Sequence, residues 1–217
     1  MDKKKLIYFL LMFLPLVITL FALPFLPEMT PAHYNFEGEV DRWGSKYENL
    51  IFPAVTVGMG LFMLWMAKIS AKDENGEKNE KVVFYTGMGL SVWFTVMHCY
   101  FLFMEFKNAT NLNDFEIDIN RLFCIVMGIG LMVFGKFMPK LKRNSLIGLR
   151  TGWSMKNDET WEKSQAFGGA LFIVGGLLMV ISAFVFKGIG AMFVSLGILI
   201  LCAVSGTVYS YKIAKKY

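Results

Sequence analysis

Four residues of one short segment could together perform acid–base or metal chemistry. His33 is followed by Glu37, Glu39 and Asp41, so one imidazole and three carboxylates lie within nine residues. Such groups can move a proton during hydrolysis or bind a divalent metal ion. The segment offers one His and no paired Cys, whereas a catalytic zinc site normally takes three protein ligands. We therefore expect no metal or other cofactor, and a metal-dependent hydrolase is the alternative hypothesis.

The loop around these residues, 27–49, has the features of an ordered structure. Pro27 and Pro31 keep the backbone extended, and Gly38 and Gly44 permit tight turns. We expect its polar residues to hold the loop together by hydrogen bonds and ion pairs, or to contact an extracellular ligand. These residues are His33, Asp41, Arg42 and Lys46.

A second segment, 138–165, combines basic residues with Trp153 and Trp161. Gly148 breaks the chain just before Arg150, so we expect a turn there. Indole rings partition to the level of lipid headgroups, and we expect both Trp side chains at that level. The segment is either a basic hairpin that rests on lipid or a surface that docks a protein partner.

Long apolar runs carry both segments. Hydrophobic residues make up 55% of the chain and charged residues 18%, and the charges fall outside the runs, as is typical of a polytopic membrane protein. Asn157 followed by Asp158 and Glu159 is typical of a helix N-cap, so the fifth helix should begin before its apolar run. We predict an all-α integral membrane protein with six transmembrane helices, over residues 6–26, 50–67, 82–104, 119–137, 166–186 and 188–211.

Basic residues concentrate on one side of these spans. The side that holds both chain ends would carry 17 of the 22 Lys and Arg residues, within 3–5, 68–81, 136–163 and 212–216. The positive-inside rule then predicts an N-in/C-in topology, with the loop 27–49 outside and the loop 138–165 in the cytoplasm. Attraction to anionic lipid accounts for the net charge of +5, so no direct nucleic-acid partner is expected.

Polar residues inside the runs are few. No Asp or Glu interrupts them, which disfavours a small-solute transporter, the third hypothesis. In the third run Ser91, Thr95 and His98 share a helical face. We interpret them as an interhelical hydrogen-bonding seam, with ligand binding by His98 as the alternative.

Arg121, at the membrane boundary, either extends to the headgroups or pairs with an acidic neighbour. The candidate neighbours are Glu105, Glu116 and Asp118.

The two loops resemble those of the SdpI family of bacterial immunity proteins. The outer loop is similar to the family's N-terminal domain of unknown function, at Pro31, His33, Asn35, Gly38, Asp41, Gly44, Ser45 and Lys46. The inner loop is similar to the family's second pattern, at Asn144, Gly148, Arg150, Thr151, Trp153 and Trp161. In two places the sequence departs from the family. Gly152 replaces the usual Pro, and Ser164 with Gln165 replaces a His-Arg pair.

The resemblance implies an N-terminal domain, 1–68, a charged cytoplasmic linker, 69–81, and a four-helix region, 82–217. It also implies a protein of the bacterial plasma membrane that protects the producing cell from its own secreted peptide toxin. In one system of the family the immunity protein also senses the toxin and sequesters an autorepressor at the membrane. The expected partners are therefore the lipid bilayer, a toxin at the outer motif and a cytoplasmic transcriptional repressor at the inner motif.

Overall fold

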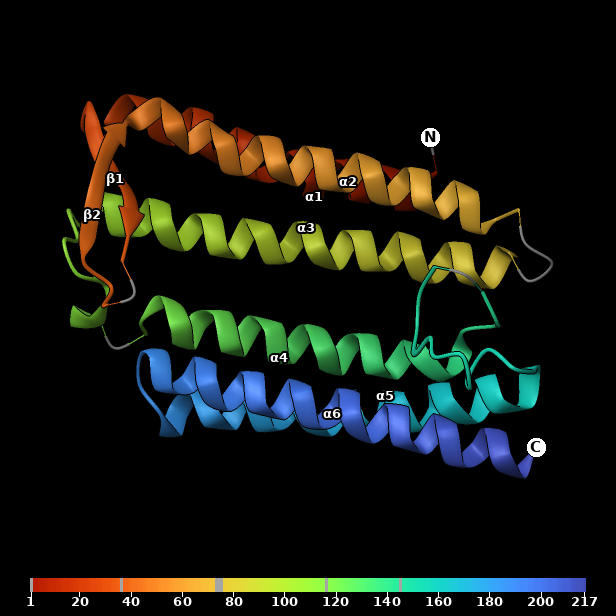
Figure 1. Cartoon of the computed structure of the whole chain (residues 1–217). Coiled ribbons are helices and arrows are strands. Elements are labelled where there is room, and N and C mark those ends of the chain that lie inside the picture. Colours follow the sequence, from red (N-terminus) through yellow and green to blue (C-terminus); the bar gives the residue numbers. More distant parts are fainter. Residues whose placement is uncertain (1, 36, 73–75, 116, 145) are drawn as a thin grey trace.

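Six long helices lie side by side in the computed structural model, which describes residues 2–35, 37–72, 76–115, 117–144 and 146–217 (Figure 1). They are α1 (Lys3–Ala22), α2 (Ile51–Ser70), α3 (Gly76–Phe106), α4 (Ile119–Phe137), α5 (Asp158–Val185) and α6 (Ile189–Lys216). Each is long and apolar enough to cross a membrane, which confirms the six predicted spans.

The helices form two sets of three. α1, α2 and α3 pack on one another, as do α4, α5 and α6, and α3 with α4 makes the main helix contact between the sets (Figure 1). Glycines allow α4 and α5 to approach closely. A Cβ on Gly135 would lie 2.6 Å from the backbone oxygen of Gly169, and a Cβ on Gly128 would lie 2.6 Å from that of Gly176.

The packing places α3 differently from the predicted division of the chain. That division put α3 with the C-terminal region 82–217, whereas α3 packs more extensively on α1 and α2 than on α4. The proposed linker, 69–81, includes residues 73–75, which lie outside the described residues. Its remaining residues belong mainly to the last turn of α2 and the first turns of α3.

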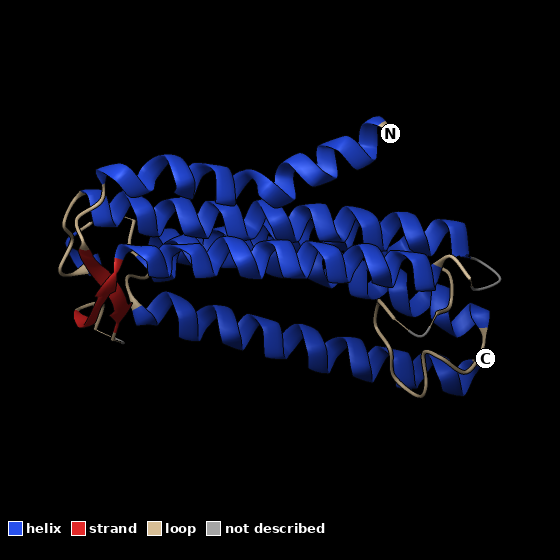
Figure 2. Ribbon diagram, turned by 90° about the horizontal axis from the view of Figure 1, so that it is seen from above, coloured by secondary structure: helices blue, strands red, loops and turns tan. Residues whose placement is uncertain are grey.

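α1 bends at its middle (Figure 2), and its first half stays packed on the bundle, where Tyr8 and Met12 are fully buried and the Tyr8 hydroxyl donates to the Gly60 oxygen of α2 at 2.9 Å. Pro15 lies inside this helix. Proline has no N–H group to donate along the helix and its ring crowds the preceding turn, so a bend is expected there. The second half of α1 is also packed on the other helices, and Thr19 there is fully buried.

The predicted ordered loop folds as an antiparallel hairpin of β1 (Met29–Tyr34) and β2 (Val40–Ser45). The all-α prediction is therefore confirmed for the membrane helices, but it missed this sheet. Gly38 lies in the turn with a φ of 79°, which favours glycine. Gly44 was wrongly assigned to a turn. It lies within β2, where a Cβ would overlap the Glu48 carboxylate.

The hairpin covers one end of the bundle, called here the hairpin end, and both chain termini lie at the other, called the terminal end (Figures 1 and 2). The segment 138–157 also lies at the terminal end (Figure 1). The prediction that Asn157 caps the fifth helix is confirmed. Its side chain accepts a hydrogen bond from the Thr160 N–H at 2.8 Å, and the Thr160 hydroxyl accepts one from the Asn157 N–H at 3.2 Å.

Candidate functional site

Side-chain contacts join the two strands of the hairpin and link β2 to the 3-10 helix Lys46–Leu50 that follows it. His33 Nδ1 lies 2.6 Å from Asp41 Oδ1, and both side chains are exposed. Arg42 donates to Glu48 through two hydrogen bonds of 2.9 and 3.3 Å, and it also donates to the backbone oxygen of Ala32. The hydrogen bond and the charge of Glu48 raise the pKa of the Arg42 guanidinium, which therefore stays charged.

The remaining residues of the outer motif shape the turn and the return to the membrane. The Asn35 side chain accepts the Glu39 N–H at 2.9 Å, while the Asn35 N–H donates to the Glu39 oxygen at 2.8 Å. Lys46 is largely buried and pairs with Glu28 at 2.9 Å. Pro31 is buried in β1. The outer motif therefore builds the hairpin, and His33, Asp41 and Arg42 are exposed.

The hairpin also contacts the connection between α3 and α4. The Val40 N–H donates to the Thr110 oxygen at 2.9 Å, and the Leu112 N–H donates to the Gly38 oxygen at 2.8 Å. Tyr34 donates to the backbone oxygen of Ala109 at 3.2 Å. Burial is the main reason that the pKa of Tyr34 is raised to about 12. The hairpin thus links the two helix sets at this end.

Glu105 is a site residue whose role the sequence did not reveal. It lies near the end of α3, is 5% exposed, and accepts a hydrogen bond from Asn49 Nδ2 at 2.7 Å. The buried Thr30 of β1 also donates to its carboxylate. The sequence offers one hint of this role, a carboxylate directly after an apolar run, but from the sequence we expected Glu105 only as a candidate partner of Arg121.

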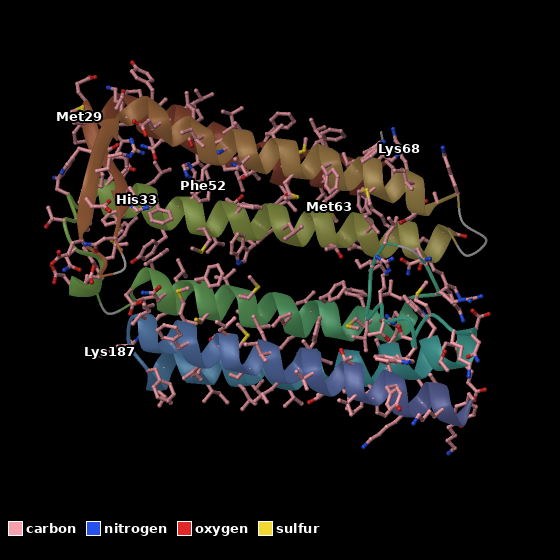
Figure 3. The ribbon with its side chains drawn as sticks, viewed as in Figure 1. Met29, His33, Phe52, Met63, Lys68 and Lys187 are labelled. Carbon is pink, nitrogen blue, oxygen red and sulfur yellow. The ribbon has the colours of Figure 1, made fainter. Side chains whose placement is uncertain are left out.

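A cavity of about 510 Å³ lies beneath the hairpin. Figure 3 shows His33 on the hairpin and Phe52 near the start of α2, and both line this cavity. Glu105 and His98 contribute from α3. α4 and α6 complete the wall with Ile119, Asn120, Ile189 and Met192.

His98 joins helices, as its interhelical interpretation predicted. Its Nε2 lies 2.6 Å from the hydroxyl of Thr19 in α1, and its ring stacks on Phe52 of α2 at 5.6 Å. Ser91 and Thr95, however, bond to backbone oxygens of their own helix, at Gly87 and Ser91 respectively. Only His98 of the predicted seam therefore makes a hydrogen bond between helices.

Arg121 pairs with an acidic neighbour. Its Nε lies 3.6 Å from Asp118 Oδ2, and it donates to the backbone oxygen of Phe186 at 3.3 Å. Glu105 is instead engaged by Asn49, and Glu116 lies outside the described residues. Arg121 therefore ties the start of α4 to the end of α5.

At the terminal end, Asn144 organises the segment 138–157. Its side-chain oxygen accepts the N–H groups of Leu146 and Ile147, each at 2.8 Å. Its amide donates to the oxygens of Lys142 and Ile147. Asn144 is 5% exposed. This motif residue therefore shapes the loop from within.

Thr151 and Ser154 cap a short turn in the same segment. The Thr151 hydroxyl accepts the Ser154 N–H at 3.0 Å, and the Ser154 hydroxyl accepts the Thr151 N–H at 2.9 Å. The Thr151 hydroxyl also lies 2.8 Å from that of Ser210 in α6. Gly152, the next residue, has open space where a side chain would begin.

The expected position of Trp161 was wrong. Trp161 is fully buried beside Met138 and Leu141, and its indole N–H donates to the Leu141 oxygen at 2.8 Å. The loop folds back over the first turns of α5 and covers this ring, so it does not reach lipid headgroups. Trp153 is 44% exposed and contacts Tyr211 edge to face.

Only part of the inner motif lies on the surface. Arg150 and Trp153 are exposed, whereas Asn144 and Trp161 are buried. Gly148 is partly buried, with a φ of 114° that favours glycine. A partner could therefore contact Arg150 and Trp153 directly.

The metal-dependent hydrolase receives no support from the geometry. Within the described ranges, no three His, Cys, Asp or Glu side chains are grouped to hold a metal ion. His33 contacts the carboxylate of Asp41, at 2.6 Å.

The fold and both loops define the class of the protein, a multi-pass membrane protein. Residues 140–210 match the SdpI/YfhL protein family, and residues 10–57 match a domain of unknown function, DUF1648. The chain is 22% identical to the immunity protein SdpI of Bacillus subtilis (strain 168) over 214 residues, which cover 99% of this chain and 97% of that protein. No solved structure matches. These matches confirm the resemblance to the SdpI family and identify a bacterial multi-pass membrane protein.

Proposed function

We propose that the chain is a membrane immunity protein that protects its cell from a secreted antimicrobial peptide toxin. The observation that carries the proposal is similarity to an immunity protein along nearly the whole of both chains. The inner motif falls within the match to the SdpI/YfhL family, and the outer motif falls within the match to the domain of unknown function.

The hairpin end faces the outside in this proposal, and the terminal end faces the cytoplasm. Lys68 lies toward the terminal end and Lys187 at the hairpin end (Figure 3). The terminal end also carries the basic residues 3–5, 140–163 and 212–216. The excess of Lys and Arg at that end supports this orientation. The toxin would then meet the hairpin first.

Expression in a toxin-sensitive strain tests protection. We expect survival to rise relative to cells that carry the empty vector. Immunoblotting of membrane fractions must show that the protein is inserted. An inserted protein that protects against no related peptide toxin would overturn the proposal.

We propose a second activity, in which the chain senses the toxin and sequesters an autorepressor at the membrane. Arg150 and Trp153 support it, because they are the exposed members of the inner motif. Arg150 also makes no ion pair within the described part of the chain. Its guanidinium is therefore available to a partner.

Arg150→Ala separates the two activities. We expect it to reduce recruitment of a fluorescently labelled repressor to the membrane and to leave protection unchanged. Arg143→Ala is the matched control, because Arg143 is an exposed Arg of the same segment that is already paired with Asp158 at 2.8 Å. Equal loss of recruitment in both variants, or loss of protection in Arg150→Ala, would contradict this division of roles.

A further inference from the structure

The cavity beneath the hairpin has the size and lining of a ligand site. Its volume of about 510 Å³ falls within the range of about 300–1,000 Å³ that is typical of pockets for small ligands. Much of its wall is aromatic or aliphatic, with Phe52, Phe101, Ile189 and Met192 among its lining residues. A space of this size holds a few side chains of a peptide rather than a folded partner.

The charged groups of the cavity leave one carboxylate without a cation. Arg42 and Glu48 neutralise each other. Glu105, in contrast, is bonded to the neutral side chains of Asn49 and Thr30. In the described residues no Lys, Arg or His forms an ion pair with it. Water screens a buried carboxylate poorly, so Glu105 should attract a cation that enters the cavity.

The surroundings of Glu105 favour an organic cation over a metal ion. A metal ion needs several oxygen or nitrogen ligands, and in the described ranges Glu105 belongs to no group of three His, Cys, Asp or Glu side chains. Phe52 and Phe101 instead line the same cavity. Aromatic faces attract ammonium groups and also cover apolar parts of a ligand.

We propose that this cavity binds the primary ammonium group of an apolar peptide, with Glu105 as the counter-ion. The inference rests on the proposed function, because a secreted peptide toxin is a ligand of this class. The inference adds to that function a binding site for the toxin, and this site includes Glu105, which belongs to neither loop motif. His33 and Arg42 line the cavity from the hairpin side and would contact the peptide as it enters.

A pair of matched probes tests the site. The dipeptide amide Leu-Phe-NH₂ with a free amino terminus is compared with its N-acetylated form, using equilibrium dialysis against the full chain in detergent micelles. Micelles without protein correct for partitioning. We expect the free amine to bind about tenfold more tightly than the acetylated form, because its ammonium group and the Glu105 carboxylate are both charged and such hydrogen bonds are stronger than neutral ones.

Three variants test whether Glu105 and the cavity cause the preference for the free amine over the acetylated probe. Glu105→Gln should abolish it, since glutamine keeps an oxygen for Asn49 but has no charge. Glu39→Gln removes an exposed carboxylate of the hairpin that does not line the cavity, so it should keep the preference. Met192→Trp should weaken binding of both probes by filling the cavity, and it tests the site without altering Glu105.

The inference fails if wild-type protein binds both probes equally or neither of them. It also fails if Glu105→Gln retains the preference, or if Met192→Trp, shown by circular dichroism to be folded, leaves binding unchanged. Failure of the proposed function looks different. In that case the amine preference is present and depends on Glu105, but the wild-type chain gives no protection in cells.

Discussion

The side-chain amide of Gln165 makes two hydrogen bonds to the backbone of Leu149, one to its N–H and one to its carbonyl oxygen. Gln165 Oε1 accepts the Leu149 N–H at 2.9 Å, and its Nε2 donates to the Leu149 oxygen at 3.0 Å. Gln165 is fully buried. This pair of hydrogen bonds joins α5 to the inner loop at the residue that follows Gly148. Gln165 is one of the two residues, with Ser164, that replace the family's His-Arg pair in this chain.

Gln165→Met should destabilise the protein, because methionine has a similar volume but makes neither hydrogen bond. The Leu149 oxygen would keep its bond from Ser154, whereas the partly buried Leu149 N–H would lose its partner, at a cost of up to about 1–3 kcal/mol. Thermal unfolding in detergent, followed by circular dichroism, measures the loss. Glu162→Gln is the control, since it removes only an exposed ion pair. Equal midpoints for Gln165→Met and wild type would show that the pair adds no stability.

Gly152→Pro should be tolerated and should raise stability by about 0.4–1 kcal/mol. Gly152 follows the capping residue Thr151, and proline is favoured at the first position after a cap. A side chain there would meet open space. The same thermal measurement applies, with Gly148→Pro as the contrasting variant, because the φ of 114° at Gly148 is incompatible with proline. A large loss of stability in Gly152→Pro would contradict the assignment of Thr151 as the residue that caps this turn.

Trp161→Phe should cost roughly 2–4 kcal/mol, because it leaves a void in the core and removes the donor for the buried Leu141 oxygen. Trp153→Phe should change stability much less, since Trp153 is 44% exposed. Urea unfolding in mild detergent compares the two. The placement of Trp161 is wrong if both substitutions have the same small effect.

The pair of Arg42 and Glu48 should couple weakly. Its side chains are 55% and 36% exposed, so a double-mutant cycle with alanine should give only a small coupling free energy. The coupling should fall when salt is raised, because solvent screens exposed charges. Unfolding midpoints at low and high salt provide the measurement. A coupling that is large and independent of salt would mean that the pair is shielded from solvent.

The sequence determined the elements that depend on neighbours along the chain. Runs of apolar residues of sufficient length predicted the six helices, and the order Asn157, Asp158, Glu159 predicted the start of α5. Proline and glycine spacing predicted an ordered loop, although not its pairing as strands. Each of these features depends on residues that are close along the chain, from a few residues for a helix cap to about 20 for a transmembrane span, so it can be read locally.

The tertiary structure decided which polar groups meet. Asn49 bonds Glu105 from a distance of 56 residues along the chain, and His98 bonds Thr19 from 79 residues away. The burial of Trp161, which its sequence context placed at the membrane surface, likewise depends on how the inner loop folds back over α5. Such contacts arise from the packing of whole helices and loops, and local spacing carries no information about them. For that reason the sequence revealed the two motif loops, whereas only the tertiary structure revealed the cavity around Glu105.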